Sequence, residues 1–389
     1  MSQYSSQRIS GFSETVFSKY TALANKYRAI NLGQGFPNFG EPEIIMNAYR
    51  EAANDYQQYA PGSGMPVFNK AAAMAKSNLI KRSVDPNTEI QVTVGATEAL
   101  FAIAQAFINP GDEVILIEPF YDAYPADVIM AGGIPKYIPL IPQKDGTWLL
   151  DFDELDKLFS DKTKAIFINT PHNPTGKVFD VTEIDRIIAL AEKYDALIVS
   201  DEPYEYAAFK EHVSPLARPG GWERTLAISS IGKTFSVTGW KIGYIVGPSE
   251  LINDVNMAHQ WIPFAVATPL QIASAKALEI ANQSNNSYFA DLKELFIKKR
   301  DLLQNALLQS AFKPLKSDGT YFIIADSSEL GYKDDVSLCD DMPKRFGVAA
   351  IPPSAFYSDE HKYLAKNLLR FAFCKTDEML IEAGKRLVE

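Results

Sequence analysis

A lysine in this chain sits where its amine could take part in chemistry. A β-rich run from Leu226 to Ser229 leads into the sequence SIGK, residues 230–233, and a second β-rich run spans Ile242 to Val246. Lys233 is therefore expected at the mouth of a strand, among small residues and hydroxyls. An amine whose pKa is lowered by desolvation or by nearby cations can attack a carbonyl and form a Schiff base. Since most lysines are solvated surface charges, this interpretation depends on the rest of the chain.

Other apolar runs end in polar or glycine-containing clusters in the same way. The predicted strands, each with any cluster that follows it, are 90–94 (Gly95, Ala96, Thr97), 113–117 (Tyr121), 136–141, 165–169 (Asn173), 197–200 (Asp201, Tyr204), 226–229 (Ser230, Lys233) and 242–246. Helical stretches alternate with these runs, which predicts an α/β fold with a mostly parallel, seven-stranded sheet covered by helices. Because ligands of open sheets bind beyond the carboxyl ends of the strands, the clusters mark the predicted active site.

Several of these side chains match what pyridoxal chemistry at Lys233 would require. A protonated ring nitrogen needs a buried carboxylate, and Asp201 is the candidate. Asn173 and Tyr204 can donate hydrogen bonds to the phenolate oxygen of the ring. Tyr121 can stack on the face of the ring.

The remaining groups of such a cofactor and of an amino acid also find candidates. A phosphate needs amide donors at a helix N-terminus, which the turn at Ala96 and Thr97 offers, and Ser230 and Lys241 can add a hydroxyl and a cation. Arg370 stands in an apolar, β-like run, where an unpaired guanidinium would be costly. A bidentate arginine suits the carboxylate of an amino acid.

Each of these features also has an ordinary structural interpretation. Asp201 could cap a helix, residues 173–176 could form a simple turn, Tyr121 could be a core aromatic, and Arg370 could belong to a structural ion pair. The combination is harder to explain in this way, because all of these residues follow or lie in apolar strands and appear in one order along the chain.

Composition restricts the classes of partner and compartment. The formal net charge of -10 argues against nucleic acid or an anionic membrane as the main partner. No apolar run approaches the roughly 18–20 residues that span a bilayer, and the N-terminus lacks the apolar core of a signal peptide. The two cysteines, Cys339 and Cys374, form no metal or redox motif, and the four histidines show no ligand spacing. We therefore expect a cytoplasmic protein that binds no metal.

The chain is long enough for one large and one smaller domain. Residues 5–28 are expected to form an amphipathic helix that runs into the loop GQGFPNF, residues 33–39. We predict an N-terminal segment (1–45) that contributes to the small domain, a large cofactor-binding domain (46–284) and a small α+β C-terminal domain (285–389). The N-terminal segment is expected to pack with the C-terminal region.

The ordered set of motifs resembles the fold-type I pyridoxal-phosphate aminotransferases of class I and II, over nearly the whole chain. The motifs are NLGQGFPNF, QYAPGSG, VTVGATEAL, EPFYDAY, NTPHNPTGKV, SDEPYE, SSIGKTFSVTGWKIGY and LLRFAF. Within this family the chain is most similar to the methionine and the kynurenine (glutamine) aminotransferases. The resemblance implies pyridoxal 5'-phosphate as cofactor and a ping-pong transfer of an amino group to a 2-oxo acid.

The resemblance also implies specific roles for the residues. Lys233 would be the Schiff-base lysine and proton shuttle, and Arg370 would hold the substrate carboxylate with Asn173 and the Gly35 backbone. Tyr59 would reach the phosphate of a neighbouring subunit, which implies a homodimer with shared sites. At Lys241 many relatives have arginine, although the methionine and kynurenine group also carries lysine there.

The resemblance places a mostly apolar pocket around the side chain of the substrate. Its walls would be Phe17, Phe36, Tyr121, Trp261 and Phe264, which favours methionine, with phenylalanine, tyrosine and kynurenine as further donors. No second arginine for a dicarboxylate is evident. A carbon–sulfur β-lyase that acts on cystathionine or cysteine conjugates is the alternative within the same chemistry. A cofactor-binding regulator without turnover is less favoured, because such proteins add a basic DNA-binding module and this chain is acidic.

Overall fold

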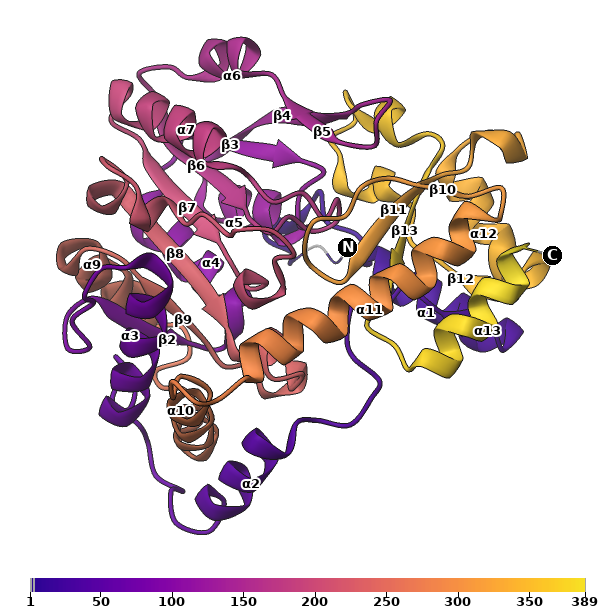
Figure 1. Ribbon diagram of the computed structural model, residues 1–389. Coiled ribbons are helices and arrows are strands. Elements are labelled where there is room, and N and C mark those ends of the chain that lie inside the picture. Colours follow the sequence, from indigo (N-terminus) through magenta and orange to yellow (C-terminus); the bar gives the residue numbers. More distant parts are fainter. Residues whose placement is uncertain (1, 3, 389) are drawn as a thin grey trace.

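An eight-stranded sheet forms the centre of the computed structural model, which describes residue 2 and residues 4–388 (Figure 1). The strand order is β2-β9-β8-β7-β6-β3-β4-β5. The strands are β2 (Ile90–Thr93), β3 (Glu113–Glu118), β4 (Ile134–Pro142), β5 (Trp148–Leu150), β6 (Thr163–Asn169), β7 (Leu197–Asp201), β8 (Thr225–Ser230) and β9 (Gly243–Val246). The five strands from β8 to β4 pair in parallel, whereas β9 is antiparallel to β2 and β8, and β5 is antiparallel to β4.

The seven predicted strands are all present and the sheet is mostly parallel, but the predicted number of strands was wrong. The eighth strand, β5, forms a hairpin with the end of β4, with Leu140 opposite Leu150. Trp148 and Leu150 are buried and Leu149 is exposed. Three residues are too few for this alternation to stand out in a sequence, so the edge strand was missed.

The strand register brings the predicted clusters together. Asn169 at the end of β6 lies opposite Asp201 at the end of β7, and Asp201 lies opposite Ile228 in β8. Every residue of β7 except Leu197 and every residue of β8 is buried, as expected for parallel strands with both faces covered. The carboxyl ends of these strands therefore meet at one edge of the sheet.

Helices cover both faces of this sheet. Their bounds are α2 (Glu43–Ala52), α3 (Pro66–Ile80), α4 (Gly95–Phe107), α5 (Ala123–Ala131), α6 (Phe152–Leu158), α7 (Val181–Lys193), α8 (Ile231–Thr234), α9 (Ser249–His259) and α10 (Thr268–Ala281). On one face α4, α5 and α9 share a core with the strands, to which Leu100, Phe167 and Val255 belong. On the other face α3 and α10 pack against β2 and β9, while α6 and α7 pack against β3 and β6.

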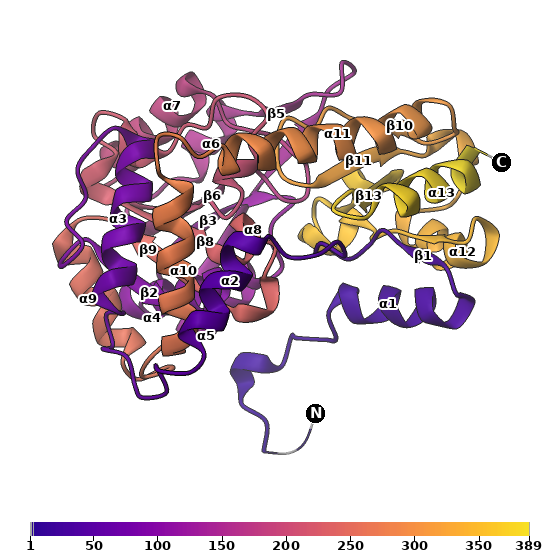
Figure 2. The same ribbon diagram turned by 60° about the horizontal axis from the view of Figure 1, so that its bottom comes forward.

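A smaller α+β region combines both ends of the chain (Figure 2). Its strands and helices are β1 (Ile30–Asn31), β10 (Lys313–Pro314), β11 (Phe322–Asp326), β12 (Val348–Ala349), β13 (Leu368–Ala372), α1 (Val16–Tyr27), α11 (Tyr288–Leu308), α12 (Asp335–Arg345) and α13 (Asp377–Val388). The strands β10, β11 and β13 form an antiparallel sheet, and β1 pairs in parallel with β12. This pairing confirms that the N-terminal segment packs with the C-terminal region. The domain boundaries 1–45, 46–284 and 285–389 stay a prediction.

The N-terminal segment contains less helix than predicted. Residues 5–28 were expected to form one helix, but a short 3-10 helix, η1 (Gln7–Ile9), is followed by irregular chain before α1 begins at Val16. The Ser6 side chain accepts a hydrogen bond from the Arg8 backbone, which shows how serine competes with helical hydrogen bonding. The helix ends at Arg28 in the left-handed conformation, with φ of 52°.

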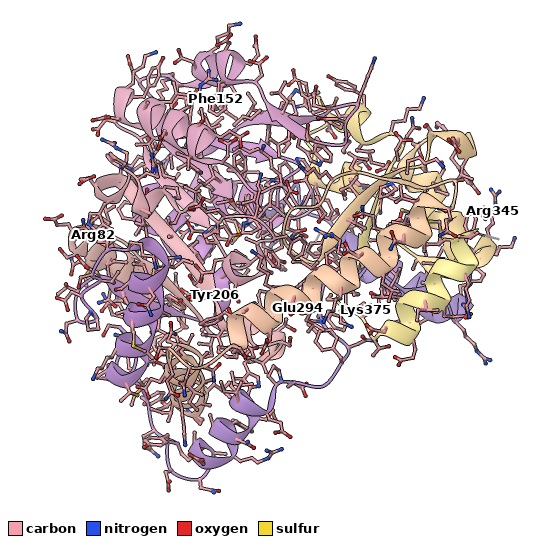
Figure 3. All side chains as sticks on the ribbon, viewed as in Figure 1. Arg82, Phe152, Tyr206, Glu294, Arg345 and Lys375 are labelled. Carbon is pink, nitrogen blue, oxygen red and sulfur yellow. The ribbon has the colours of Figure 1, made fainter. Side chains whose placement is uncertain are left out.

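Side chains fill the space between the layers (Figure 3). Short 3-10 helices occupy several connections: η2 (Glu205–Ala207), η3 (Pro215–Ala217), η4 (Trp222–Arg224), η5 (Thr238–Trp240), η6 (Ser328–Leu330), η7 (Pro353–Phe356) and η8 (Lys362–Ala365). Tyr206 in η2 stacks on Phe289 in α11 with 3.9 Å between ring centroids, so the segment after β7 is tied to the long helix that joins the two regions. Among the described residues, no helix is long and apolar enough to cross a membrane.

Candidate active site

A cavity of about 230 Å³ lies between the carboxyl ends of the strands and the small α+β region. The predicted site residues that line it are Phe17, Gly35, Ala96, Thr97, Tyr121, Asn173, Asp201, Tyr204, Ser230, Lys233, Lys241 and Arg370. They come from both ends and the middle of the chain. The structure therefore brings together most of the residues that the sequence singled out.

Lys233 stands in α8, the single helical turn that follows β8. Burial lowers the pKa of its amine to about 8, and the nearby cations Lys241 and Arg370 act in the same direction. The amine donates a hydrogen bond of 2.8 Å to the hydroxyl of Tyr321. About a tenth of this amine is thus unprotonated at pH 7, far more than for an ordinary lysine, and the unprotonated form is the nucleophile.

Asp201 ends β7 and offers the cavity a carboxylate oxygen without a partner. Its Oδ2 accepts a hydrogen bond of 2.6 Å from the hydroxyl of Tyr124, whereas its Oδ1 is buried and has no hydrogen-bond partner among the described residues. Burial raises the pKa of this carboxyl to about 7. A buried oxygen without a donor is costly, and a protonated ring nitrogen is the kind of donor that would satisfy it.

Asn169 aligns the neighbours of Asp201. Its side-chain amide donates a hydrogen bond of 2.7 Å to the Asp201 carbonyl, and its Oδ1 accepts one of 2.6 Å from the Asn173 backbone N–H. Asn173 in turn accepts from Arg370 through Oδ1 at 3.1 Å, which leaves its NH₂ group as a donor. Burial holds the pKa of Tyr204 well above its ordinary value, so this hydroxyl also stays a donor.

The start of α4 has the features of an anion-binding helix N-terminus. Gly95 has φ of +72°, and a Cβ on it would lie 3.2 Å from the Cε of Lys241. A Cβ on Gly243 would lie 2.7 Å from the Gly95 carbonyl carbon, so the two glycines allow close approach of β9 to the helix. The Lys241 ammonium donates to the Thr97 hydroxyl at 3.3 Å. With Ser230 at the end of β8, these groups suit a phosphate at the positive end of the helix.

Arg370 in β13 is 1% exposed and has no carboxylate within salt-bridge distance among the described residues. Its Nη1 donates to Asn173 and its Nη2 to the Gly33 carbonyl at 2.7 Å, while its Nε is buried without a partner. The guanidinium carbon lies 4.2 Å from the ring centroid of Phe322 and 5.2 Å from that of Phe17. Burial lowers its pKa to about 10, so the group keeps a charge that an incoming carboxylate would neutralise.

The predicted role of Gly35, whose backbone would help hold the substrate carboxylate, stays a prediction. The loop carbonyl that accepts from Arg370 belongs to Gly33, whereas the Gly35 carbonyl accepts from the Tyr321 hydroxyl at 2.7 Å. Gly35 still lines the cavity. Its backbone lies against Phe322, whose ring a Cβ at Gly35 would strike.

Some predicted residues lie outside the cavity of the single chain. Tyr59 is 84% exposed, Trp261 85% and Phe264 60%, and Phe36 is also exposed. The expected pocket wall is therefore only partly formed, by Phe17 and Tyr121. The rings of Tyr59 and Phe264 contact each other edge to face at 5.3 Å. The loops that carry Tyr59 and Phe264 thus meet on the surface of the molecule and do not reach into the cavity of this chain.

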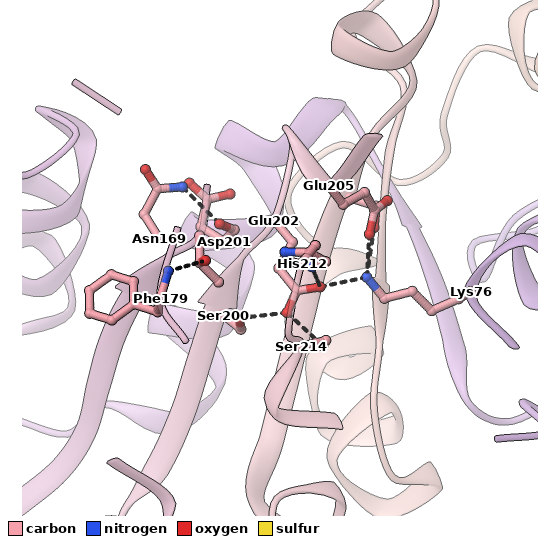
Figure 4. A network of polar contacts seen from close by, with 11 residues as sticks. Lys76, Asn169, Phe179, Ser200, Asp201, Glu202, Glu205, His212 and Ser214 are labelled. Carbon is pink, nitrogen blue, oxygen red and sulfur yellow. Dashed lines mark hydrogen bonds and ion pairs between the residues drawn. The ribbon is translucent and has the colours of Figure 1, made fainter. Parts of the chain in front are cut away.

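A buried ionic network supports the strand end from behind (Figure 4). Lys76 is fully buried and contacts Glu202 at 2.7 Å and Glu205 at 2.5 Å. Burial opposes its charge, but the two carboxylates outweigh this effect and raise its pKa. Glu202 also accepts hydrogen bonds from Ser200 and Ser214, each 2.7 Å long. Figure 4 shows Asp201 and Lys76 on opposite sides of Glu202, so the network fixes the residue next to Asp201.

The sequence interpretation missed several residues of the site. Tyr124 contacts Asp201, Asn169 aligns Asn173, and Tyr321 contacts Lys233. The first two lie within motifs that were recognised, EPFYDAY and NTPHNPTGKV. Tyr124 lies on the buried side of α5 with Asp127 and Val128. Because a buried tyrosine hydroxyl usually has a hydrogen-bond partner, this position could have suggested a polar role for it.

The chain matches the family model "Aminotransferase class I and II" over residues 27–387. It is 39% identical to the kynurenine–oxoglutarate transaminase of Dictyostelium discoideum, over 99% of this chain and 96% of that protein. It is 40% identical to the probable N-succinyldiaminopimelate aminotransferase DapC of Mycobacterium tuberculosis (strain H37Rv), over 98% and 97%. The crystal structure of Escherichia coli YbdL, which identified a methionine aminotransferase function, superposes with a TM-score of 0.94 at 35% identity, with full coverage of both chains.

The cavity fits the cofactor of this family in each of its parts. An amine of lowered pKa, a carboxylate oxygen without a donor and an anion site at a helix N-terminus meet in one space. These are the groups that pyridoxal 5'-phosphate needs at its aldehyde, its ring nitrogen and its phosphate. The chain belongs to the class I and II aminotransferases and is a pyridoxal-phosphate-dependent enzyme.

Proposed function

We propose that this enzyme moves the amino group of an apolar or aromatic L-amino acid to a 2-oxo acid, with methionine as the favoured donor. Phenylalanine, tyrosine and kynurenine are the further donors. The lining of the cavity carries this proposal: Phe17, Tyr121 and Phe322 supply aromatic walls, and Arg370 is the one arginine among the described lining residues. Aromatic walls favour thioether and aromatic side chains, whereas a donor with two carboxylates would need a second cation.

The names of the relatives do not decide the donor. Similar proteins are named for kynurenine, for N-succinyldiaminopimelate and for methionine. The identities to these three relatives lie within a narrow range, from 36% to 40%. The choice of methionine therefore rests on the residues that line the cavity of this chain.

The side chains support a division of roles in catalysis. Pyridoxal phosphate, when bound, supplies an aldehyde and an electron-accepting ring. Lys233 holds the cofactor through its amine and, once displaced by the substrate, accepts the α-proton and returns a proton to the cofactor side. Arg370, Asn173 and the Gly35 backbone hold the substrate carboxylate, which orients the α-carbon towards Lys233. A second 2-oxo acid then binds at the same residues and the transfer runs in reverse.

The other cavity residues would hold the cofactor itself. Asp201 would pair with the ring nitrogen, Asn173 and Tyr204 would donate to the phenolate oxygen, and Tyr121 would cover the face of the ring. The phosphate would be held by Ala96, Thr97, Ser230 and Lys241. The support for these roles is that all of these residues line one cavity.

We also propose that two copies form a homodimer with shared sites in the cytoplasm. The exposed rings of Tyr59, Trp261 and Phe264 support this proposal, because large exposed aromatic side chains close together mark interaction surfaces. Tyr59 of one copy would reach the phosphate in the cavity of the other. Both cysteines are free and buried, which is compatible with a reducing compartment.

Absorption spectroscopy tests the proposal directly. The purified protein with pyridoxal phosphate should show a band near about 420 nm, which gives way to one near about 330 nm when methionine is added. Aspartate, kynurenine, phenylalanine and N-succinyldiaminopimelate are added in parallel to rank the donors. The variant Lys233→Ala should lose the first band, whereas Lys70→Ala, which alters an exposed lysine on α3, should keep both bands.

Each outcome of this experiment has a defined meaning. Conversion by aspartate with no response to methionine would contradict the proposed pocket. A band that never shifts with any amino acid would contradict aminotransferase activity. Release of pyruvate and a thiol from cystathionine, faster than any amino transfer, would identify the β-lyase alternative.

A further inference from the structure

The amine of Lys233 meets a hydroxyl that none of the roles above uses. Its Nζ donates a hydrogen bond of 2.8 Å to the Tyr321 hydroxyl. Tyr321 comes directly before β11, far from Lys233 along the chain, and its ring lies behind the cavity and not in its lining. Only the hydroxyl reaches the amine, from the side of the small α+β region.

The direction of this hydrogen bond is fixed by a second one. The single proton of the Tyr321 hydroxyl is donated to the Gly35 carbonyl at 2.7 Å. The oxygen therefore presents its lone pairs to Lys233 and acts there as an acceptor. Burial holds the pKa of Tyr321 well above its ordinary value, so the hydroxyl stays neutral and keeps both hydrogen bonds.

The ring that carries this hydroxyl is held rigidly. Tyr321 is 1% exposed and packs edge to face against Tyr204 with 5.1 Å between ring centroids. The Tyr321 carbonyl accepts a hydrogen bond of 2.9 Å from the Phe373 backbone N–H. The preceding residue, Thr320, has φ of 65°, a conformation that a β-branched residue rarely adopts and that often accompanies functional sites.

We infer that Tyr321 is a positioning residue that holds the Lys233 amine in one orientation whenever this amine is not bonded to the cofactor. This inference rests on the proposed function, in which Lys233 accepts the α-proton of the substrate during that interval. A free lysine side chain has several rotatable bonds and would otherwise sample many directions. A fixed acceptor limits this sampling, which favours proton transfer over a short, defined path.

The inference predicts the sign of a pKa change. A hydroxyl that accepts from Lys233 stabilises its charged form, so the variant Tyr321→Phe should lower the pKa of the amine. A merely looser site would admit water and raise this pKa towards its ordinary value. The other titratable and charged groups that face Lys233 are unchanged in the variant: Asp201, Tyr204, Lys241, Arg370 and Cys374.

The experiment measures the rate at which cofactor-free protein combines with pyridoxal phosphate, across a range of pH. The rate is followed at about 420 nm for the unaltered protein, Tyr321→Phe and Tyr194→Phe. Tyr194 is the matched control, because its hydroxyl donates to Asp156 at 3.0 Å, far from the cavity. We expect the pH midpoint to fall in Tyr321→Phe and to stay unchanged in the control. The thermal unfolding of each variant is measured together with its loading rate.

The loaded enzymes then supply a second measurement. With saturating methionine, the first half reaction should slow by about 10- to 100-fold in Tyr321→Phe, while the apparent Kd for methionine stays within about twofold, because Arg370 still holds the carboxylate. An unchanged or raised midpoint in a variant whose unaltered parent loads and turns over would overturn the role of Tyr321 alone. Failure of the unaltered protein to form the band would overturn the proposed function, and this inference with it.

Discussion

Arg370 combines two properties that rarely occur together, full burial and the absence of a carboxylate partner. Replacement by methionine should therefore separate function from stability. The loss of a charge-assisted, bidentate contact is expected to lower kcat/KM by about 100-fold, which corresponds to roughly 3 kcal/mol of lost transition-state stabilisation. The free energy of unfolding should not fall, because a buried, uncompensated charge is removed. Steady-state kinetics and urea unfolding measure the two effects.

Arg300 supplies the control for this prediction. It is half-buried on α11, and its guanidinium contacts Asp301 and the Ser317 carbonyl, outside the cavity. Arg300→Met should leave kcat/KM close to that of the unaltered enzyme. A full retention of activity in Arg370→Met would mean that the substrate carboxylate binds elsewhere.

Asp201 makes a pH-dependent contribution to the stability of the cofactor-free protein. Its pKa is about 7 in the folded chain and about 3.9 when unfolded. Between these values the folded state binds more protons, so stability falls as pH rises. The full difference amounts to up to about 4 kcal/mol. Asp201→Asn should remove this slope, which urea unfolding at pH 5 and pH 7.5 would reveal.

Other groups do not obscure that comparison. Burial raises the pKa of Asp127 to about 8. Asp127 therefore makes the same pH-dependent contribution to the stability of the unaltered protein and of Asp201→Asn, so the difference between these two proteins isolates Asp201. Asp326→Asn, a change at the end of β11 that lies outside the cavity lining, should keep the slope of the unaltered protein. Identical slopes in the unaltered protein and Asp201→Asn would show that Asp201 is ionised in the folded chain.

The sequence predicted residues with a distinctive chemistry and missed those whose role depends on position alone. Lys233, Asp201 and Arg370 are charged residues beside apolar runs, a pattern that stands out in any sequence. Tyr124 and Tyr321 look like ordinary core aromatics, and only the folded chain shows that their hydroxyls meet Asp201 and Lys233.

At the scale of the elements, strands were predicted better than helices. The seven long strands are apolar runs bounded by polar clusters, which makes them visible. Helices α5, α6, α8, α9, α10, α12 and α13 were not predicted. In α10 the buried residues include many alanines and a serine, so its packing face carries little hydrophobic contrast, although a proline in its first turn marks the helix start.

The ionic network behind β7 allows a prediction about the element that carries Asp201. Lys76→Met should leave the carboxylate of Glu205 buried without its cation and that of Glu202 with only the neighbouring His212 ring, which is expected to cost about 3–5 kcal/mol of unfolding free energy. The triple variant Lys76→Met, Glu202→Gln, Glu205→Gln removes the charges together and should recover most of this loss. Chemical denaturation of the cofactor-free proteins measures both effects.

Lys299 offers a matched lysine for this comparison. It is also buried, but its acidic partner Asp377 has a side chain that is 65% exposed. Lys299→Met leaves that carboxylate in water, so its cost should be clearly smaller than that of Lys76→Met. An equal loss in both variants would mean that lost packing of the lysine stem, and not the unpaired charge, dominates.

At the scale of the whole molecule, the exposed aromatic residues Tyr59, Trp261 and Phe264 support the proposed second copy. The sequence could not predict these interface residues from contacts, because an interface is a property of two surfaces and the motif QYAPGSG shows only one of them. The variant Trp261→Asp places a charge in the proposed interface. It should shift the mass in sedimentation from twice 43.2 kDa towards the 43.2 kDa of one chain, whereas Tyr363→Asp, at another exposed aromatic residue, should not.

A shared site can be tested more sharply by mixing two inactive variants. If Tyr59 serves the cavity of the other copy, the defects of Tyr59→Ala and Lys233→Ala fall in the same site of a mixed dimer, and its second site has neither defect. Random exchange should then restore about a quarter of the full activity. Lys233→Ala and Arg370→Met both act in their own chain, so every site of their mixed dimers carries a defect and no activity should return. Recovery in neither mixture, from inactive variants that exchange subunits, would mean that Tyr59 does not serve the cavity of the other copy.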